Sequence, residues 1–275
     1  MFDEKHTRQL KGKVGFDDET VEHWKEISKK MYIPFTEDNI ILQFEGFDKL
    51  KDLNWGKYHE KYGEVLRLDR ILEKENDSPN NYNASKQADV LMLFYLFSSQ
   101  ELMKIFNELG YEFEAEYIPK NVDYYQKITS HGSTLSQMIH SWVFARSDRH
   151  SSWSSFRKAL RSDIDDVQGG TTPEGIHLGA MAGSVDVLQR CYTGLEIRDD
   201  ILWLNPRLPR EVEEIKFHIR YRGHWIKLSI NHKKLYIDFE KGWAAPVEIN
   251  VQGKGKRFEI NDSAEFKLKE AKGRV

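Results

Sequence analysis

Two stretches rich in glycine and hydroxyl side chains carry the residue types that hold an anion. They are residues 129–136 (TSHGSTLS) and residues 169–177 (GGTTPEGIH), and each stands where apolar residues at helical spacing begin. The first turn of a helix has backbone N–H groups without partners and lies at the positive end of the helix dipole. We therefore expect each stretch to hold an anion, with hydroxyl groups and a histidine ring beside it.

Helix capping explains part of the same pattern. Ser133 fits the N-cap of a helix that begins near Leu135. Thr171 and Glu174 fit a capping box, with Pro173 in the first turn. The two interpretations are compatible, because a helix start that is not fully capped is what binds an anion.

Other polar residues have structural alternatives. His177 is explained equally well as a buried histidine with satisfied hydrogen bonds, and His140 is interpreted as packing. Adjacent Asp165 and Asp166 point in different directions, so we assign them structural roles in the turn before the glycines. Nowhere do His, Cys, Asp and Glu cluster at metal-ligand spacing, and we expect no metal.

Composition excludes several classes of protein. The chain of 275 residues has 41 basic and 44 acidic side chains, a net charge of -3, which gives no basic field for nucleic acid. The single cysteine, Cys191, excludes an internal disulfide and fits a reducing compartment. The sequence has no apolar run of about eighteen residues and no apolar signal region, so we expect no membrane contact and a cytoplasmic location.

Helical spacing dominates the chain as far as Gly194. Apolar residues predict helices over residues 17–31, 85–97, 100–109, 135–146, 153–160 and 176–191, the second of them buried on nearly all sides. Residues 1–14 predict a frayed start, and residues 40–47 a short extended segment followed by irregular structure to about 83. Successive helical hairpins favour an α-toroid over a simple four-helix bundle.

After Gly194 the apolar period changes from 3.6 to 2. Strands are predicted at residues 195–198, 201–204, 215–221, 225–230, 235–239, 247–251 and 257–260, separated by turn residues. This pattern predicts an antiparallel sheet or small sandwich and places a domain boundary near Gly194.

Four motifs, in this order, resemble the C-terminal half of glycoside hydrolase family 65. They are residues 86–90 (KQADV), 129–136, 165–183 (DDVQGGTTPEGIHLGAMAG) and 202–209 (LWLNPRLP). The family contains inverting α-glucoside phosphorylases acting on trehalose, maltose or kojibiose, with some hydrolases. The resemblance runs from about Asp17 to the end of the chain.

The resemblance implies a mainly α fold with a C-terminal β part. Residues 1–194 would form the C-terminal half of an (α/α)6 catalytic barrel, and residues 195–275 a small antiparallel β-sandwich. The first half of the barrel, with the glutamate that serves the family as general acid, would lie outside this chain. We therefore assign no catalytic residue here.

The resemblance also assigns binding residues. In an inverting phosphorylase an acid protonates the glycosidic oxygen while phosphate attacks C1 from the opposite face. The family motifs imply that phosphate is clamped by His131, Gly132, Ser133, Thr134, Gly170, Thr171 and His177. Lys86 and Gln87 would bind hydroxyl groups of the transferred glucosyl unit. Inorganic phosphate is the co-substrate, and no cofactor is expected.

Two classes of function fit these expectations. The chain is part of an α-glucoside disaccharide phosphorylase that works with a complementing N-terminal polypeptide. Alternatively, it is a non-catalytic remnant or a sugar- and phosphate-binding module, or a fragment of a family 65 hydrolase. A half barrel would expose the apolar faces of residues 85–97 and 176–191, so we expect an oligomer or dependence on a partner polypeptide.

Overall fold

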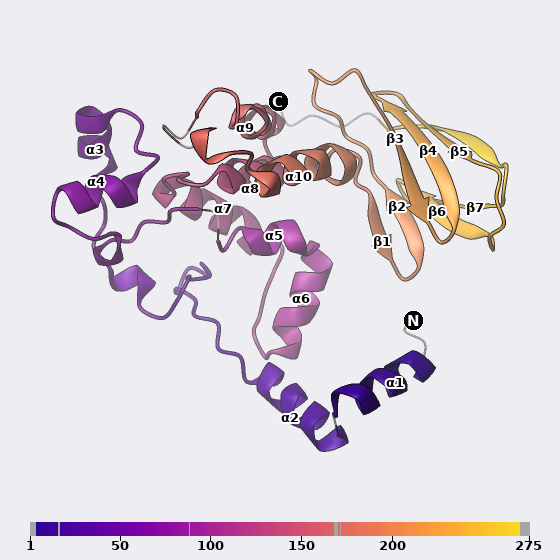
Figure 1. Ribbon diagram of the computed structural model, residues 1–275, viewed down its shortest axis with the longest axis horizontal. Coiled ribbons are helices and arrows are strands. Elements are labelled where there is room, and N and C mark those ends of the chain that lie inside the picture. The colour runs from indigo at the N-terminus through magenta and orange to yellow at the C-terminus, as the bar shows by residue number, and fades with distance from the viewer. Residues whose placement is uncertain (1–3, 16, 88, 168–169, 171, 270–275) are drawn as a thin grey trace. The chain divides into compact units, whose positions relative to one another are not determined.

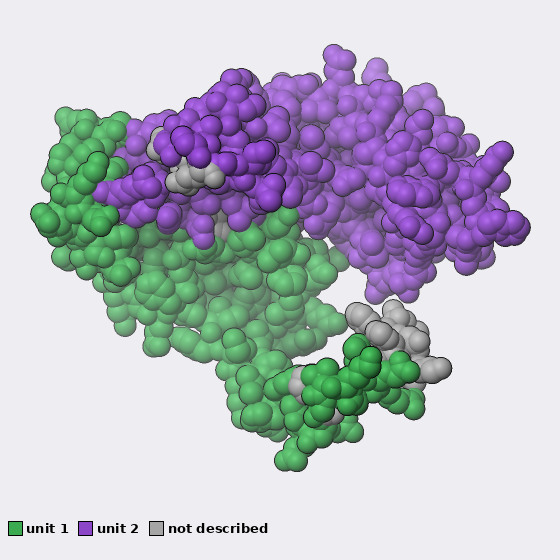
Figure 2. Space-filling view, in the orientation of Figure 1, with its two compact units in different colours: residues 1–63, 71–85, 89–129 green, residues 64–70, 86–88, 130–275 purple. Residues whose placement is uncertain are grey.

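The computed structural model describes residues 4–15, 17–87, 89–167, 170 and 172–269, and the chain forms two compact units (Figures 1 and 2). Unit 1 takes its residues from 1–63, 71–85 and 89–129, and unit 2 from 64–70, 86–88 and 130–275. None of the helices described combines the length and the apolar character needed to cross a bilayer.

Seven α-helices are described before residue 130. They are α1 (Glu4–Val14), α2 (Asp18–Lys29), α3 (Trp55–Tyr62), α4 (Leu68–Lys74), α5 (Met92–Leu96), α6 (Ser99–Glu108) and α7 (Tyr117–Ile128), with 3-10 turns at Phe47–Lys49 and Pro79–Asn81. Helix α6 begins with a capping box, in which Ser98 Oγ accepts from Glu101 N at 3.2 Å and Ser98 N donates to Glu101 Oε2 at 2.8 Å. It is followed by Gly110 with φ 82°, which confirms the helix predicted over residues 100–109.

Aromatic side chains fill the core of unit 1. Helix α7 buries Ile118, Val122 and Tyr125 at helical spacing. The Tyr125 hydroxyl donates to Ile41 O at 2.6 Å, so a buried polar atom is satisfied. The rings of Phe106 and Phe113 stack with centroids 4.4 Å apart.

Three predictions for this part of the chain are wrong. Residues 1–14 were expected to fray, but 4–14 form α1. Residues 40–47 make only an isolated bridge between Phe35 and Ile41, and the stretch to 83 contains α3 and α4. Of residues 85–97 only 92–96 are an α-helix, because the backbone of Ser85 pairs instead with Thr129.

The expected exposure of residues 85–97 is also wrong. Val90, Leu91 and Phe94 are buried in unit 1, and of the large apolar side chains in this segment only Leu96 is described as mostly exposed. Apolar composition alone does not distinguish a helix from extended backbone that is buried on both sides.

Unit 2 begins with three packed helices: α8 (Thr134–Phe144), α9 (Arg149–Arg161) and α10 (Leu178–Asp186), the last continuing as a π-helix over Val187–Cys191. A 3-10 turn at Thr172–Glu174 precedes α10. Gly183 allows α10 to approach α8, since a Cβ there would lie 2.5 Å from Met138 Cε. These helices confirm those predicted over residues 135–146, 153–160 and 176–191.

Two four-stranded sheets complete unit 2. The strands are β1 (Glu196–Arg198), β2 (Ile201–Leu204), β3 (Glu214–Tyr221), β4 (His224–Asn231), β5 (Lys234–Phe239), β6 (Val247–Val251), β7 (Lys254–Phe258) and β8 (Ser263–Lys267), in the orders β1-β2-β6-β7 and β3-β4-β5-β8. Phe239 of one sheet stacks on Phe258 of the other with centroids 5.0 Å apart.

The expectation of a purely antiparallel sandwich needs one correction. Strands β2 and β6 run parallel, while every other pair described is antiparallel. Alternation along β4, with Ile226, Leu228 and Ile230 fully buried, explains why period 2 was visible in the sequence. Strand β8 was not predicted, because its exposed residues are mainly polar.

Candidate functional site

The loop before α8, residues 130–133, is called the first glycine loop below. Gly132 N donates to Lys86 O at 2.8 Å. A Cβ at position 132 would lie 2.6 Å from Leu66 O and 3.1 Å from Lys86 Cγ, so the close approach requires glycine. The loop thereby holds two predicted binding elements together, Lys86 and the start of α8.

Ser133 occupies the N-cap of α8, with extended backbone angles, but its side chain makes no capping hydrogen bond within the described chain. The capping interpretation of Ser133 is therefore correct in position and wrong in hydrogen bonding. A helix start with backbone N–H groups and an uncommitted hydroxyl retains its capacity for an anion. Thr134, the first helical residue, is buried.

His131 lies in the left-handed backbone region at φ 55°, where histidine is more common than most residues. Its Nδ1 shares a hydrogen bond with Ser136 Oγ at 3.0 Å. Burial, together with His140 and the positive charge of Lys158, lowers the pKa of His131 to about 3. The ring is therefore neutral near pH 7 and offers one N–H donor.

His140 is buried beside His131, with ring centroids 4.5 Å apart. Its Nδ1 bonds Ser136 O at 2.9 Å, and burial lowers its pKa. The expectation that His140 packs in the core is confirmed by its 1% exposure. Within the described chain, however, His140 Nε2 and Ser130 Oγ are buried without hydrogen-bond partners, which is unusual for buried polar atoms.

Lys86 belongs to a charged cluster that the sequence did not indicate. Its Nζ lies 3.2 Å from Asp69 Oδ2, and Arg67 Nε lies 3.3 Å from Asp69 Oδ1. Partial burial would raise the pKa of Asp69, but hydrogen bonds from Arg67 and Lys86 lower it to about 2. The Lys86 side chain is half exposed, as is useful for a group that meets substrate, and Gln87 is partly buried.

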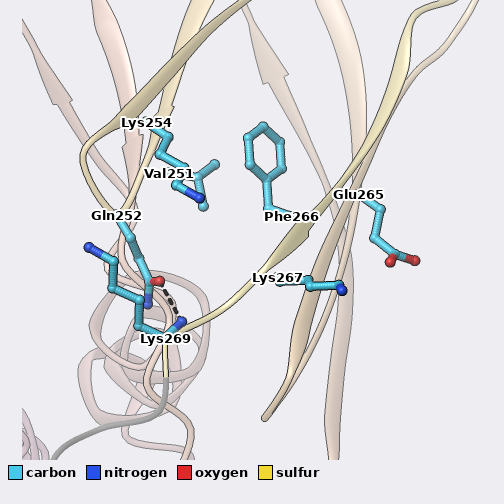
Figure 3. A pocket seen from close by; sticks show the side chains of 7 residues that line it. All are labelled: Val251, Gln252, Lys254, Glu265, Phe266, Lys267 and Lys269. Carbon is cyan, nitrogen blue, oxygen red and sulfur yellow. Dashed lines mark hydrogen bonds between the residues drawn. The ribbon is translucent and has the colours of Figure 1, made fainter.

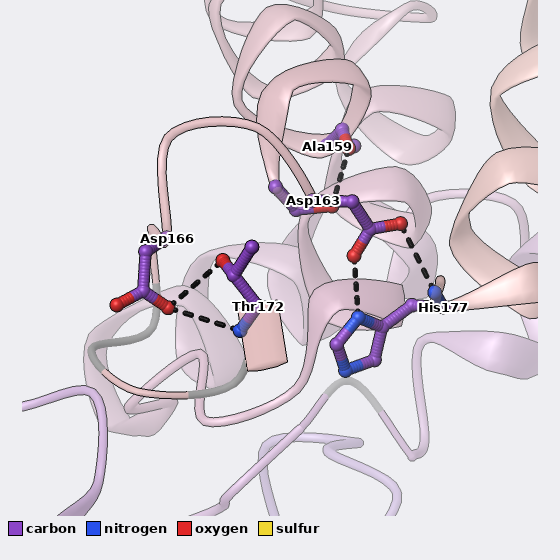
Figure 4. A network of polar contacts seen from close by, with 6 residues as sticks. Ala159, Asp163, Asp166, Thr172 and His177 are labelled. Carbon is purple, nitrogen blue, oxygen red and sulfur yellow. Dashed lines mark hydrogen bonds and ion pairs between the residues drawn. The ribbon is translucent and has the colours of Figure 1, made fainter. Parts of the chain in front are cut away.

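The loop before α10, described at Gly170 and over residues 172–177, is called the second glycine loop below, and Asp163 binds it (Figure 4). Asp163 accepts from His177 twice, from the backbone N at 3.0 Å and the ring Nδ1 at 2.5 Å. The hydrogen bond with the ring lowers the pKa of Asp163. This pairing fixes the ring and leaves Nε2 as the atom that can meet a ligand.

Asp166 shapes the same loop. Its carboxylate accepts from Gly170 N at 2.7 Å. It also accepts from Thr172 N at 3.2 Å and Thr172 Oγ1 at 3.1 Å (Figure 4). The structural role predicted for Asp166 is confirmed. Thr171, and with it the predicted capping box, lies outside the described residues.

The two loops stand at the starts of neighbouring helices, since Gly183 of α10 packs on Met138 of α8. Sequence reasoning missed Asp163, Asp69 and Arg67, because no motif or spacing distinguishes them from the other charged residues of the chain. Among the residues described, no group of three or more His, Cys, Asp and Glu side chains could hold a metal ion.

Comparison with known proteins identifies the family. Residues 2–186 match the model of the glycosyl hydrolase family 65 central catalytic domain, and residues 195–257 match that of the family 65 C-terminal domain. The chain belongs to glycoside hydrolase family 65. The resemblance inferred from the four motifs is thus confirmed.

Family 65 relatives include proteins named as disaccharide phosphorylases. An uncharacterized glycosyl hydrolase of Mycobacterium tuberculosis is 49% identical over 258 residues, which are 94% of this chain and 19% of the relative. Trehalose 6-phosphate phosphorylase of Lactococcus lactis is 33% identical over 220 residues, which are 80% of this chain and 29% of the relative.

A solved structure, described as a candidate kojibiose phosphorylase from the human microbiome, superposes with a TM-score of 0.70 at 26% identity. The match covers 95% of this chain and 32% of that one. Helices followed by C-terminal sheets are thus consistent with the family 65 fold, while the (α/α)6 barrel stays a prediction. The chain spans less than a third of the length of each of these relatives.

Proposed function

We propose that this chain provides the phosphate side and part of the glucosyl side of an inverting α-glucoside phosphorylase. The observation that carries the proposal is the start of α8, where the Ser133 side chain makes no capping hydrogen bond within the described chain and Gly132 lies close to Lys86. Family membership and the names of the relatives support it.

The proposed phosphate contacts follow from the geometry of the two loops. Phosphate oxygens accept hydrogen bonds from the first backbone N–H groups of α8 and from Ser133 Oγ. Asp163 engages Nδ1 of His177, so Nε2 is the atom proposed to contact phosphate. His131 contributes from the first loop as a neutral ring, and Gly132, Thr134, Gly170 and Thr171 complete the proposed clamp.

Lys86 and Gln87 are proposed to bind hydroxyl groups of the transferred glucosyl unit. Asp69 and Arg67 hold the Lys86 ammonium in place, which reduces the freedom it must lose when substrate binds. Because Gly132 joins Lys86 to the first glycine loop, the sugar and phosphate would be held side by side.

The proposed reaction is a single displacement. A phosphate oxygen forms a bond to C1 of an α-linked glucosyl unit, and the bond from C1 to the glycosidic oxygen breaks with inversion. The departing oxygen takes a proton from a general acid, giving β-glucose 1-phosphate and a free sugar. No residue described here is assigned as that acid, and we propose that a complementing N-terminal polypeptide supplies it.

The substrate class proposed is an α-linked disaccharide of glucose. Relatives named trehalose 6-phosphate phosphorylase, kojibiose phosphorylase and maltose phosphorylase support the class. Inorganic phosphate is the proposed co-substrate.

Titration of inorganic phosphate by calorimetry tests the anion site. Ser133→Ala should weaken binding roughly tenfold or more, because hydrogen bonds to charged groups contribute about 1.5–3 kcal/mol. Ser154→Ala, an exposed serine in α9, is the matched control and should bind as the wild type does. Equal phosphate affinity in all three proteins would remove the proposed site.

A further inference from the structure

A separate cavity of about 800 Å³ lies among β1, β2 and the turn between β6 and β7. Its size falls within the range of about 300–1,000 Å³ typical of small-molecule sites. Trp203 and Leu204 of β2 both line it, with Trp203 half-buried and Leu204 buried. Glu196 of β1 lies directly opposite Trp203.

Trp203 gives this cavity an aromatic wall. The guanidinium carbon of Arg198 lies 5.5 Å from the centre of the Trp203 ring. The indole Nε1 is buried and has no hydrogen-bond partner among the residues described. Because Nε1 is buried, the accessible part of the indole ring is apolar, which suits the apolar face of a ligand such as a sugar ring.

The charges around the cavity are unbalanced. Arg198 is paired, with its Nε 2.7 Å from Glu196 Oε2. Arg207 and Lys269 also line the cavity, and neither makes an ion pair with a carboxylate of the described chain. Arg149 adds positive charge nearby, since it donates to Arg207 O, and burial together with Arg207 lowers its pKa.

A smaller neighbouring cavity extends the basic surface. It measures about 230 Å³ and shares Gln252 and Lys269 with the larger one, while adding Lys254 and Lys267 (Figure 3). Its one lining carboxylate, Glu265, is paired with Lys234, which leaves the lysines in excess. Both cavities therefore favour an anion.

The backbone around the larger cavity is fixed. Asn205 N donates to Thr193 O at 3.0 Å, and Arg207 N to Tyr192 O at 2.8 Å. Gln252 Oε1 accepts from Lys269 N at 2.9 Å (Figure 3). Three lining side chains are exposed, those of Asn205, Arg207 and Lys269, so they can contact a ligand without breaking these backbone hydrogen bonds.

We propose that this cavity binds a phosphorylated sugar. The sugar ring packs beside Trp203, and the phosphate binds Arg207 and Lys269. The first glycine loop takes no part, so the proposal goes beyond the proposed function and adds a second anion site on the C-terminal sheets.

Calorimetric titration with glucose 6-phosphate, glucose and inorganic phosphate tests the proposal. Arg207→Gln should weaken binding of glucose 6-phosphate at least about tenfold. Lys227→Gln, which removes the same charge from an exposed position on β4, should leave it unchanged. Trp203→Phe should weaken glucose 6-phosphate more than inorganic phosphate. Equal melting temperatures would show that the Arg207 and Lys227 variants are folded.

Three outcomes would overturn the proposal. Affinity lost in Ser133→Ala and kept in Arg207→Gln would assign the binding to the first glycine loop. Glucose binding as tightly as glucose 6-phosphate would show a neutral-sugar site. Absence of glucose 6-phosphate binding to the wild-type chain would show that the cavity has no such ligand.

Discussion

Gly132→Ala tests the close approach that joins Lys86 to the first glycine loop. The new Cβ would stand 2.6 Å from Leu66 O, whereas real Cβ atoms essentially never lie closer than 3.0 Å to such an atom. Leu66 O is a backbone atom and cannot turn aside as a flexible side chain can, so the first glycine loop must move away from it by at least about 0.4 Å.

The magnitude follows from two terms. Overpacking costs about 1–3 kcal/mol, and loss of the 2.8 Å hydrogen bond from Gly132 N to Lys86 O costs about 1 kcal/mol more. We expect the free energy of unfolding to fall by about 2–4 kcal/mol and phosphate affinity to fall with it. Urea unfolding at 25 °C followed by circular dichroism measures the first, and calorimetry the second.

Gly179→Ala is the matched control. Gly179 lies in α10, and apart from its chain neighbours and the backbone of that helix no atom of the described residues lies within 4 Å of the position its Cβ would take. Alanine should therefore leave stability unchanged or raise it by about 1 kcal/mol. If Gly132→Ala unfolds at the same urea concentration as the wild type, the approach of Gly132 to Leu66 is not as described and the link to Lys86 fails with it.

Four further predictions concern the site and the assembly. Asp163→Asn should weaken phosphate binding as His177→Ala does. The double variant should bind no more weakly than either single variant, because both changes break the same Asp163–His177 hydrogen-bonded pair. Additive losses of affinity in calorimetry would show that the two residues act independently. The pKa of His131 is about 3 in the folded chain and 6.5 in the unfolded chain, so below pH 6.5 the unfolded chain binds a proton that the folded chain does not. The contribution of His131 to the free energy of unfolding is therefore complete above pH 6.5 and is lost as pH falls toward 3. Stability should therefore drop by about 2 kcal/mol between pH 7 and pH 5, and urea unfolding should show less of this drop in His131→Asn but not in His232→Asn. The chain alone should release no glucose 1-phosphate from trehalose, maltose or kojibiose in a coupled assay; release that His177→Ala abolishes would show that the acid is present here. Exposed Leu178 and Val185 on α10 should drive self-association that Leu178→Ser reduces, and a wild-type monomer in light scattering would refute this.

Apolar periodicity predicted the helices and strands that have one buried face and one exposed face. Helices α2, α6, α8, α9 and α10 and seven of the eight strands described were predicted to within a few residues. The failures occurred where neighbours override local preference. The backbone of Ser85 pairs with Thr129, and the carbonyl of Lys86 accepts from Gly132 N, so this segment does not begin a helix. Helix α7 was not predicted. Its Pro119 lies in the first turn, where the missing N–H removes no hydrogen bond of the helix.

The candidate site could be predicted only as two loops. Motif order pointed to residues 129–136 and 169–177, but the partners that hold them come from elsewhere in the chain. Asp163 lies 14 residues before His177, and Asp69 lies 17 before Lys86. Contacts at such separations depend on the fold and leave no local pattern in the sequence.

The parallel pairing of β2 with β6 has a consequence for synthesis of the chain. Strand β2 finds its second partner only when residues 247–251 have been made, and β5 finds its second partner only with residues 263–267. Until then one side of β2 and one side of β5 are unpaired, and unpaired strand edges promote aggregation. We therefore expect both sheets to be completed late, after nearly the whole of unit 2 has been synthesised.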